Sequence, residues 1–301
     1  MNGTTTVQLA EKTAKAVTGS VEEWTGFLQS AARLYKYSYP EQLLIYAQRP
    51  DATACASYEI WNQTMRRYVR RGARGIALPD GAGAVRYVFD VADTGARKSS
   101  REVKTWALDE NNREAVAHAL ETQYGSAAKL GIAGQLEEIA MQQSMDYWQW
   151  HQDELRGIVD GSFLEGYDEL NLEIAFRNTA AASVKYMLLS RCNLAREYQI
   201  EPEELAGVLE WNTSAASGAL GSAVSELSEG VLRQIERTIR QYERSQNHDE
   251  RTDVYEERRV LDSRSDSSRT VGDTEQIRTD AGAVSEGASD DHLQQPAPER
   301  E

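Results

Sequence analysis

The sequence predicts an α+β protein: a small N-terminal domain of helices and antiparallel sheet, followed by a mainly α-helical region and a disordered acidic tail. Three observations predict this class. Short apolar runs separated by turn residues occupy residues 52–91, which is typical of strands. Apolar residues recur at helical spacing through residues 111–244. Residues 245–301 contain mainly charged and small polar residues and too few apolar ones to form a core.

Charge is distributed unevenly along the 301 residues, whose net charge is −15. Residues 1–104 contain 15 Lys and Arg against 10 Asp and Glu, whereas residues 105–242 contain 10 against 22. Residues 243–301 contain 8 against 16. This asymmetry predicts that the basic N-terminal part and the acidic remainder have different roles.

Two helices are predicted near the N-terminus. The polar residues 1–19 are expected to be flexible. Ser20 then begins a helix, because Glu23 follows three positions later in the capping-box pattern. Pro40 suits the first turn of a second helix, and Pro50 would end it.

A sheet is predicted after these helices. The segment 71–91 alternates like two strands joined by a loop at 79–83. With the helices, these strands define an α+β domain at residues 20–95, and a linker is expected at 96–110. The acidic helical region at 111–244 follows, and the tail begins at 245. The clearest helical pattern is its last apolar stripe: Leu220, Val224, Leu227, Val231, Leu232, Ile235 and Ile239.

The sequence contains no recognisable catalytic motif. Its four histidines are isolated, and no H-E-x-x-H, phosphate-binding loop or G-x-S-x-G occurs. The acidic run 168–173 is typical of a solvated helix face. Cys55 and Cys192 fit no metal-ligand spacing and predict a reduced, cytoplasmic protein. No apolar run reaches the roughly 18 residues of a membrane span. We therefore expect no enzymatic activity, cofactor, metal or membrane contact.

A cluster of arginines interrupts this acidic chain. Five arginines fall within the nine residues 66–74, and aromatic residues lie nearby. Cations neutralise phosphates and flat rings stack on unpaired bases, so the combination indicates nucleic-acid binding. The same pattern also occurs in soluble edge strands that charge protects from aggregation. The candidate binding residues are Tyr46, Tyr58, Trp61, Arg66, Arg67, Tyr68, Arg70, Arg71, Arg74 and Arg86.

The individual roles follow from residue type. The arginines would contact phosphates, and the aromatic residues would offer stacking surfaces. If residues 66–71 form one strand, Tyr68 shares a face with Arg66 and Arg70. Trp61 has a second interpretation, because an indole after a short turn is often a core anchor. Contact with about four phosphates predicts a salt slope near −3 on single strands.

The order of motifs from Trp24 to Val91 resembles the N-terminal single-stranded-DNA-binding domain of ArdC-type antirestriction proteins. The matching residues are the helix end Q-L-L-I-Y-A-Q-R-P-D-A-T at 42–53, then Tyr58 and Trp61, then R-Y-V-R-R-G-A-R-G-I at 67–76. ArdC-type proteins usually also carry a metallopeptidase-like domain with H-E-x-x-H, which this sequence lacks. The domain also occurs at the N-terminus of large conjugative-element proteins, ahead of helicase or methylase modules.

The resemblance implies sequence-tolerant binding of single-stranded DNA in a mobile element, for antirestriction, transfer or replication. It also implies helicase, methylase or other conjugation proteins as partners. An alternative function uses the acidic helical region instead. The chain would then be a DNA mimic or adaptor that binds a restriction or conjugation protein, with structural arginines.

Overall fold

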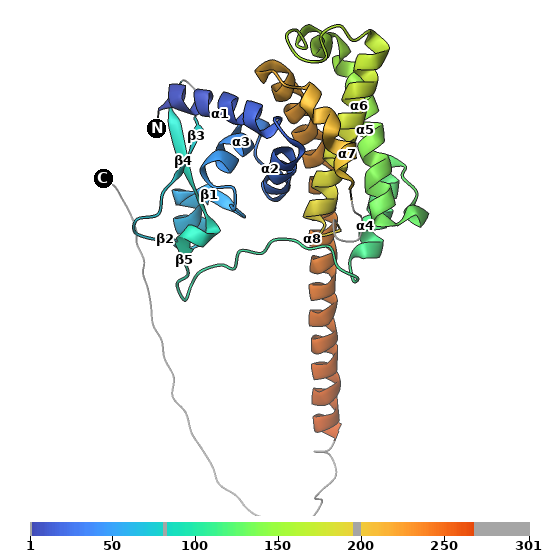
Figure 1. The fold of residues 1–301 in the computed structure, drawn as a ribbon. Helices are drawn as coiled ribbons and strands as arrows, with labels where there is room; N and C mark the ends of the chain where they lie inside the picture. Colours follow the sequence, from blue (N-terminus) through green and yellow to red (C-terminus); the bar gives the residue numbers. More distant parts are fainter. Residues whose placement is uncertain (1, 81–82, 195–199, 268–301) are drawn as a thin grey trace, which may run out of the picture. The chain divides into compact units, whose positions relative to one another are not determined.

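The structure, a computed structural model, describes residues 2–80, 83–194 and 200–267, with side chains described up to residue 246. It divides the chain into two compact units, residues 1–247 and residues 248–301. The first unit holds the sheet, the core and the candidate binding residues. Its N-terminal helices and antiparallel strands, followed by a mainly helical remainder, confirm the predicted fold class (Figure 1).

Three helices form the N-terminal part: α1 (Gly3–Val17), α2 (Val21–Arg33) and α3 (Tyr39–Gln48). Ser20 caps α2 as predicted, since its hydroxyl accepts the backbone N–H of Glu23 at 3.2 Å. The prediction of a flexible segment at 1–19 was wrong, because α1 is a helix that buries Ala14 and Val17. Residue 1 lies outside the described residues.

The strands form two small antiparallel sheets. The first has the order β1-β4-β3, with β1 (Cys55–Ser57), β3 (Ile76–Pro79) and β4 (Val85–Asp90). The pairing of Ile76 with Val88 confirms the predicted hairpin, and both side chains are buried. The second sheet pairs β2 (Tyr68–Val69) with β5 (Thr94–Gly95). Short helical turns, η1 (Ile60–Thr64) and η2 (Val91–Asp93), precede β2 and β5.

The remainder is helical, as predicted. Its elements are α4 (Arg113–Tyr124), η3 (Ala128–Leu130), α5 (Gly131–Gly157), α6 (Glu169–Arg191), α7 (Pro202–Leu205), η4 (Ala206–Glu210) and α8 (Ser214–Ser267). The helix α8 continues past residue 245, where we expected the tail to begin. The predicted tail from 268 to 301 lies outside the described residues. Among the described helices, none is long and apolar enough to span a membrane.

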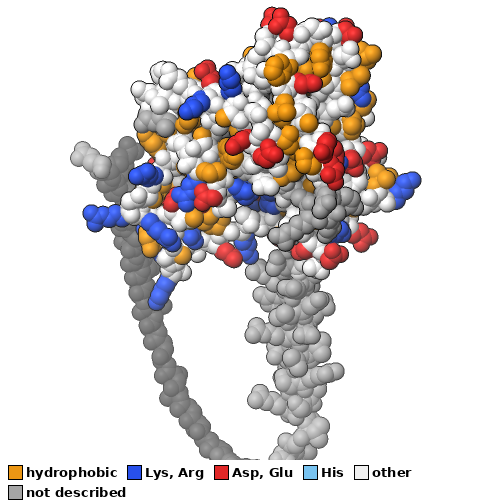
Figure 2. All heavy atoms as spheres, viewed as in Figure 1, with side chains coloured by type: hydrophobic (Ala, Val, Ile, Leu, Met, Phe, Trp, Pro, Cys, Tyr) orange, Lys and Arg blue, Asp and Glu red, His pale blue; other side chains and the backbone are white. Residues whose placement is uncertain are grey.

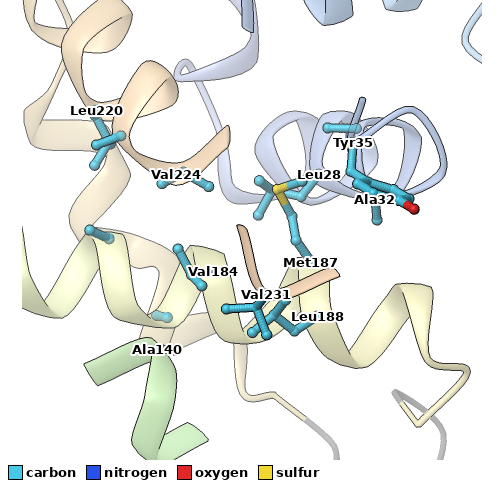
Figure 3. Packing of buried hydrophobic residues seen from close by; sticks show 14 of the residues in the cluster. Leu28, Ala32, Tyr35, Ala140, Val184, Met187, Leu188, Leu220, Val224 and Val231 are labelled. Atoms are coloured by element: carbon cyan, nitrogen blue, oxygen red, sulfur yellow. The ribbon is translucent and has the colours of Figure 1, made fainter. Parts of the chain in front are cut away.

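One apolar core joins the N-terminal helices to the helical region. Figure 3 shows Leu28 of α2 beside Met187 of α6, and Val231 of α8 beside Leu188 of α6. The indole Nε1 of Trp24 donates a hydrogen bond to Ser183 Oγ at 2.9 Å, which ties α2 to α6. The predicted domains at 20–95 and 111–244 therefore belong to one compact unit.

The expected linker at 96–110 is anchored to this core through Trp106, although most of its residues are exposed. Trp106 is 5% exposed, and its Nε1 donates to the hydroxyl of Tyr35 at 3.1 Å. The guanidinium of Arg191 lies 3.5 Å from the centre of the Trp106 ring. A free linker would leave this indole in water, so residues 96–110 are better described as an anchored connection between β5 and α4 (Figure 1).

Candidate nucleic-acid interface

The arginine-rich segment lies against a second basic segment that is distant in sequence. Backbone hydrogen bonds join Arg70 N to Asp93 O at 2.8 Å and Arg101 N to Met65 O at 2.9 Å. The hydroxyl of Ser100 donates to the carbonyl of Arg66 at 2.7 Å. Together with the β2–β5 pairing, these bonds hold residues 65–74 beside residues 94–101. We call these two segments the arginine ribbon.

The backbone of the ribbon is less regular than a strand. Arg66 has a φ of 54° and Gly72 a φ of 86°, both in the left-handed region, so β2 extends only over Tyr68–Val69. The strand is therefore shorter than the predicted one over residues 66–71. The exposure still alternates as predicted, because Arg66, Tyr68 and Arg70 are exposed, whereas Arg67 and Val69 are half-buried.

The ribbon concentrates cations that lack acidic partners. It contains Arg66, Arg67, Arg70, Arg71, Arg74, Arg97, Lys98 and Arg101. Over the residues that the structure describes, none of these eight side chains lies within 4.0 Å of a carboxylate oxygen. Arg67 is half-buried, and its Nε donates to Thr94 Oγ1 at 2.8 Å, while the other seven are exposed. Figure 2 shows Lys and Arg gathered over the region of β2 and β5, at the lower left.

Many cations elsewhere in the first unit have acidic partners. Arg49 contacts Asp93 at 2.6 Å, Arg177 contacts Glu173 at 2.8 Å, and Lys185 contacts both Glu137 and Glu204. Asp93, the acidic residue just before the ribbon's second segment, is thus held by Arg49. The positive charge of the ribbon is a local excess that no carboxylate of the described residues offsets with an ion pair.

Exposed aromatic rings accompany these cations. Tyr68 is 43% exposed, and its ring lies across Gly95, where an added Cβ would come within 2.3 Å of the ring. The guanidinium of Arg97 lies 5.6 Å from the centre of the Tyr68 ring, a cation–π contact that orients both groups. Tyr58, which is 51% exposed, lies between β1 and η1.

Three of the predicted site residues do not belong to this surface. Trp61 is 3% exposed and its Nε1 donates to the carbonyl of Phe89 at 2.8 Å, so it anchors the core and does not offer a stacking face. Arg86 lies on the helix-covered side of β4 and contacts Glu41 of α3 at 2.5 Å. Tyr46 is half-buried against Phe27, with ring centres 5.8 Å apart. Each is held by a partner from another element.

Four further residues complete the surface but are missing from the sequence prediction. Arg97, Lys98 and Arg101 supply the second segment of the ribbon. Tyr87 is 46% exposed, and its ring contacts the position of Gly75, where an added Cβ would lie 3.0 Å from Cδ1. The signal available in the sequence was the absence of acidic residues from 94 to 101.

The other titratable residues show no catalytic grouping. His151 stacks on Tyr147 with ring centres 4.1 Å apart, and Asp168 caps α6 by accepting the N–H of Asn171 at 2.8 Å. Burial raises the pKa of the Cys55 thiol to about 12, which disfavours the reactive thiolate. In the part of the chain that the structure describes, no three His, Cys, Asp or Glu side chains are grouped as metal ligands.

Comparison of the chain with protein-family models, with curated proteins and with solved structures gives no match. The functional argument therefore depends on the geometry of the site itself.

Proposed function

We propose that the chain binds single-stranded DNA through the arginine ribbon. One observation supports this proposal: in a protein whose net charge is −15, two adjoining segments hold eight cations that have no carboxylate partner among the described residues. Like-charge repulsion makes such a cluster unfavourable on its own. A polyanion supplies the missing countercharge and releases its own counterions on binding.

The exposed rings favour a single strand over a duplex. Tyr58, Tyr68 and Tyr87 present faces on which unpaired bases can stack, and each stacked base contributes about 1–3 kcal/mol. Bases of a duplex are already stacked on each other and cannot use these rings. Because every base has a flat face, we expect binding that tolerates most sequences.

The acidic helical region confines this activity to the ribbon. Residues 105–242 contain 10 Lys and Arg against 22 Asp and Glu, so DNA is repelled from most of the helical surface. In Figure 2, Asp and Glu are conspicuous on the right, over the helices. This separation gives a bound strand one preferred path on the molecule.

The proposal is tested by fluorescence anisotropy with a labelled single-stranded oligonucleotide at two salt concentrations. The test variant is Arg70→Ala/Arg71→Ala/Arg74→Ala. The control is Arg113→Ala/Lys129→Ala/Arg233→Ala, which removes three charges outside the ribbon. We expect binding that prefers single strands, weakens with salt, and is lost only in the ribbon variant. Failure of the folded wild-type protein to bind at low salt would refute the proposal.

A second candidate function is an adaptor that docks a protein through the helical region. Trp150 is 84% exposed, and Phe163 and Leu170 are also largely exposed. Large exposed apolar side chains on an acidic surface favour a protein partner. This function would be tested by a pull-down from a conjugative host, with the wild-type chain and the Trp150→Ser/Phe163→Ser variant as separate baits. Recovery of the same partner proteins by the wild type and the variant would count against it.

A further inference from the structure

A cleft separates the anchored connection 96–110 from the helices beside it. Two cavities, of about 710 and 180 Å³, share four lining residues from four parts of the chain: Arg33, Thr53, Thr105 and Arg191. Arg33 ends α2, Arg191 ends α6, and the two threonines belong to irregular segments. Among the described residues, the larger cavity is lined by no Asp or Glu.

The two arginines retain hydrogen-bond donors toward this cleft. Arg33 donates to the carbonyls of Ala52, Gln29 and Pro50 at 2.9, 3.2 and 2.8 Å. Arg191 donates to the carbonyl of Trp106 at 3.0 Å. A guanidinium carries five N–H groups. Two on Arg33 and four on Arg191 therefore remain without a partner among the described residues.

Neither arginine of the cleft forms an ion pair with the described chain, since neither lies within 4.0 Å of a carboxylate oxygen. The charges of Asp51 and Asp90 nevertheless favour the charged form of Arg33, and that of Glu236 favours the charged form of Arg191. The one acidic residue lining the smaller cavity, Glu236, is held by Tyr35, Lys36 and Arg240. Burial lowers the pKa of both Arg33 and Arg191, because desolvation disfavours the charged form. Both stay cationic at neutral pH, and an anion in the cleft would offset that cost.

We propose that this cleft binds a phosphate group between Arg33 and Arg191. Planar guanidinium groups match the oxygens of a phosphate, and the Thr105 hydroxyl supplies an additional donor. The Thr53 hydroxyl already donates to Asp90 Oδ2 at 3.4 Å. The cavity of about 710 Å³ is large enough for a nucleotide, and Thr105 follows the arginine ribbon by only four residues. The phosphate belongs either to a free nucleotide or to the end of a DNA strand. The second source rests on the function proposed above.

Inorganic pyrophosphate is the first probe, titrated into the full chain in a calorimeter. Arg191→Gln removes donors, and Thr105→Glu places a negative charge in the cleft while leaving both arginines intact. The matched controls are Arg177→Gln and Thr122→Glu, which lie outside both cavities. We expect saturable binding that each cleft variant weakens about tenfold or more and the controls leave unchanged. If Arg191→Gln fails to fold, Thr105→Glu decides the outcome.

Two further arms identify the source of the phosphate. AMP tests a free nucleotide. A 5′-phosphorylated oligonucleotide compared with its 5′-hydroxyl form tests a strand end. A preference for the phosphorylated strand that Thr105→Glu abolishes assigns the cleft to strand ends, whereas AMP binding without that preference assigns it to nucleotides.

The cleft and the ribbon are tested separately. The ribbon variant Arg70→Ala/Arg71→Ala/Arg74→Ala should still bind pyrophosphate, even where it has lost the oligonucleotide. Absence of saturable binding to all three probes, or equal binding by the cleft variants and their controls, would overturn the phosphate-site proposal. Neither result would depend on whether the ribbon binds DNA.

Discussion

The salt dependence of DNA binding is a quantitative test of the arginine ribbon. On single strands, each neutralised phosphate contributes about 0.7 to the slope of log K against log salt concentration. The ribbon holds eight cations without carboxylate partners among the described residues, so a strand contacting all of them would show a slope of about −6. Fewer contacts give a shallower slope, and contact with four gives about −3.

If all three arginines contact phosphates, the variant Arg70→Ala/Arg71→Ala/Arg74→Ala should make this slope shallower by about 2. Between 50 and 200 mM salt, a difference of 2 means that wild-type affinity falls about 16-fold more than that of the variant. The three side chains are exposed and make no ion pairs in the described structure, so the fold should survive their removal. Circular dichroism and thermal unfolding check that assumption.

Anisotropy titrations at four salt concentrations supply the slopes. The control Arg113→Ala/Lys129→Ala/Arg233→Ala changes the net charge equally and should keep the wild-type slope. Equal slopes for wild type and ribbon variant would show that these arginines contact no phosphate. Equal shifts in both triple variants would show that net charge, and not the ribbon, governs binding.

Two predictions concern stability. Gly221→Ala should destabilise the fold by about 1–3 kcal/mol, because the new Cβ would lie 2.1 Å from the buried Tyr39 ring. In Gly218→Ala the new Cβ meets nothing within 4 Å, so this substitution should stabilise the fold by up to about 1 kcal/mol. Urea unfolding measures the stability of both variants, and an equal change in the free energy of unfolding would contradict the packing described at α8. Burial raises the pKa of Glu236, but hydrogen bonds from Lys36, Tyr35 and Arg240 outweigh it and lower the pKa from 4.5 to about 2. Since the folded pKa is lower than the unfolded one, the stabilisation is complete above about pH 4.5 and is lost as the pH falls toward 2. At pH 7 we expect the free energy of unfolding of wild type to exceed that of Glu236→Gln by roughly 1–2 kcal/mol, after allowance for solvent screening. A difference in unfolding free energy that stays constant from pH 7 to pH 2 would contradict this account.

Local signals in the sequence were sufficient for most elements. The Ser20 cap and the prolines at 40 and 50 mark helix ends whose chemistry acts within one turn, so α2 and α3 lie where they were predicted. The hairpin of β3 and β4 follows from alternation around one loop. The apolar stripe ending at Ile239 likewise packs into the core through α8.

Contacts between segments that are distant in the sequence could not be predicted from such local patterns. The pairing of β2 with β5 joins two strands of two residues each, too short for any periodic signal. Trp106 lies in a polar segment, and its burial depends on Tyr35, in the turn after α2, and on Arg191 at the end of α6. The helix α1 is amphipathic, but the residues it buries, Thr6, Thr13, Ala14 and Val17, are small or polar and do not stand out as a core face in the sequence. Tertiary packing decides each of these cases.

The arginine ribbon was likewise predictable only in part, because its arginine run is local in sequence whereas its ion pairing depends on distant segments. The five arginines at 66–74 were visible as a run, but a run of charges does not reveal which charges are paired. Arg86 looked equivalent to Arg70 in the sequence, yet Glu41 on α3 neutralises it. Conversely, Arg97 and Arg101 looked like linker residues until the backbone bonds of residues 65–70 drew them into the cluster. Only the folded chain shows which cations form ion pairs and which do not. A polyanion is the ligand that would match the unpaired positive charge of the ribbon.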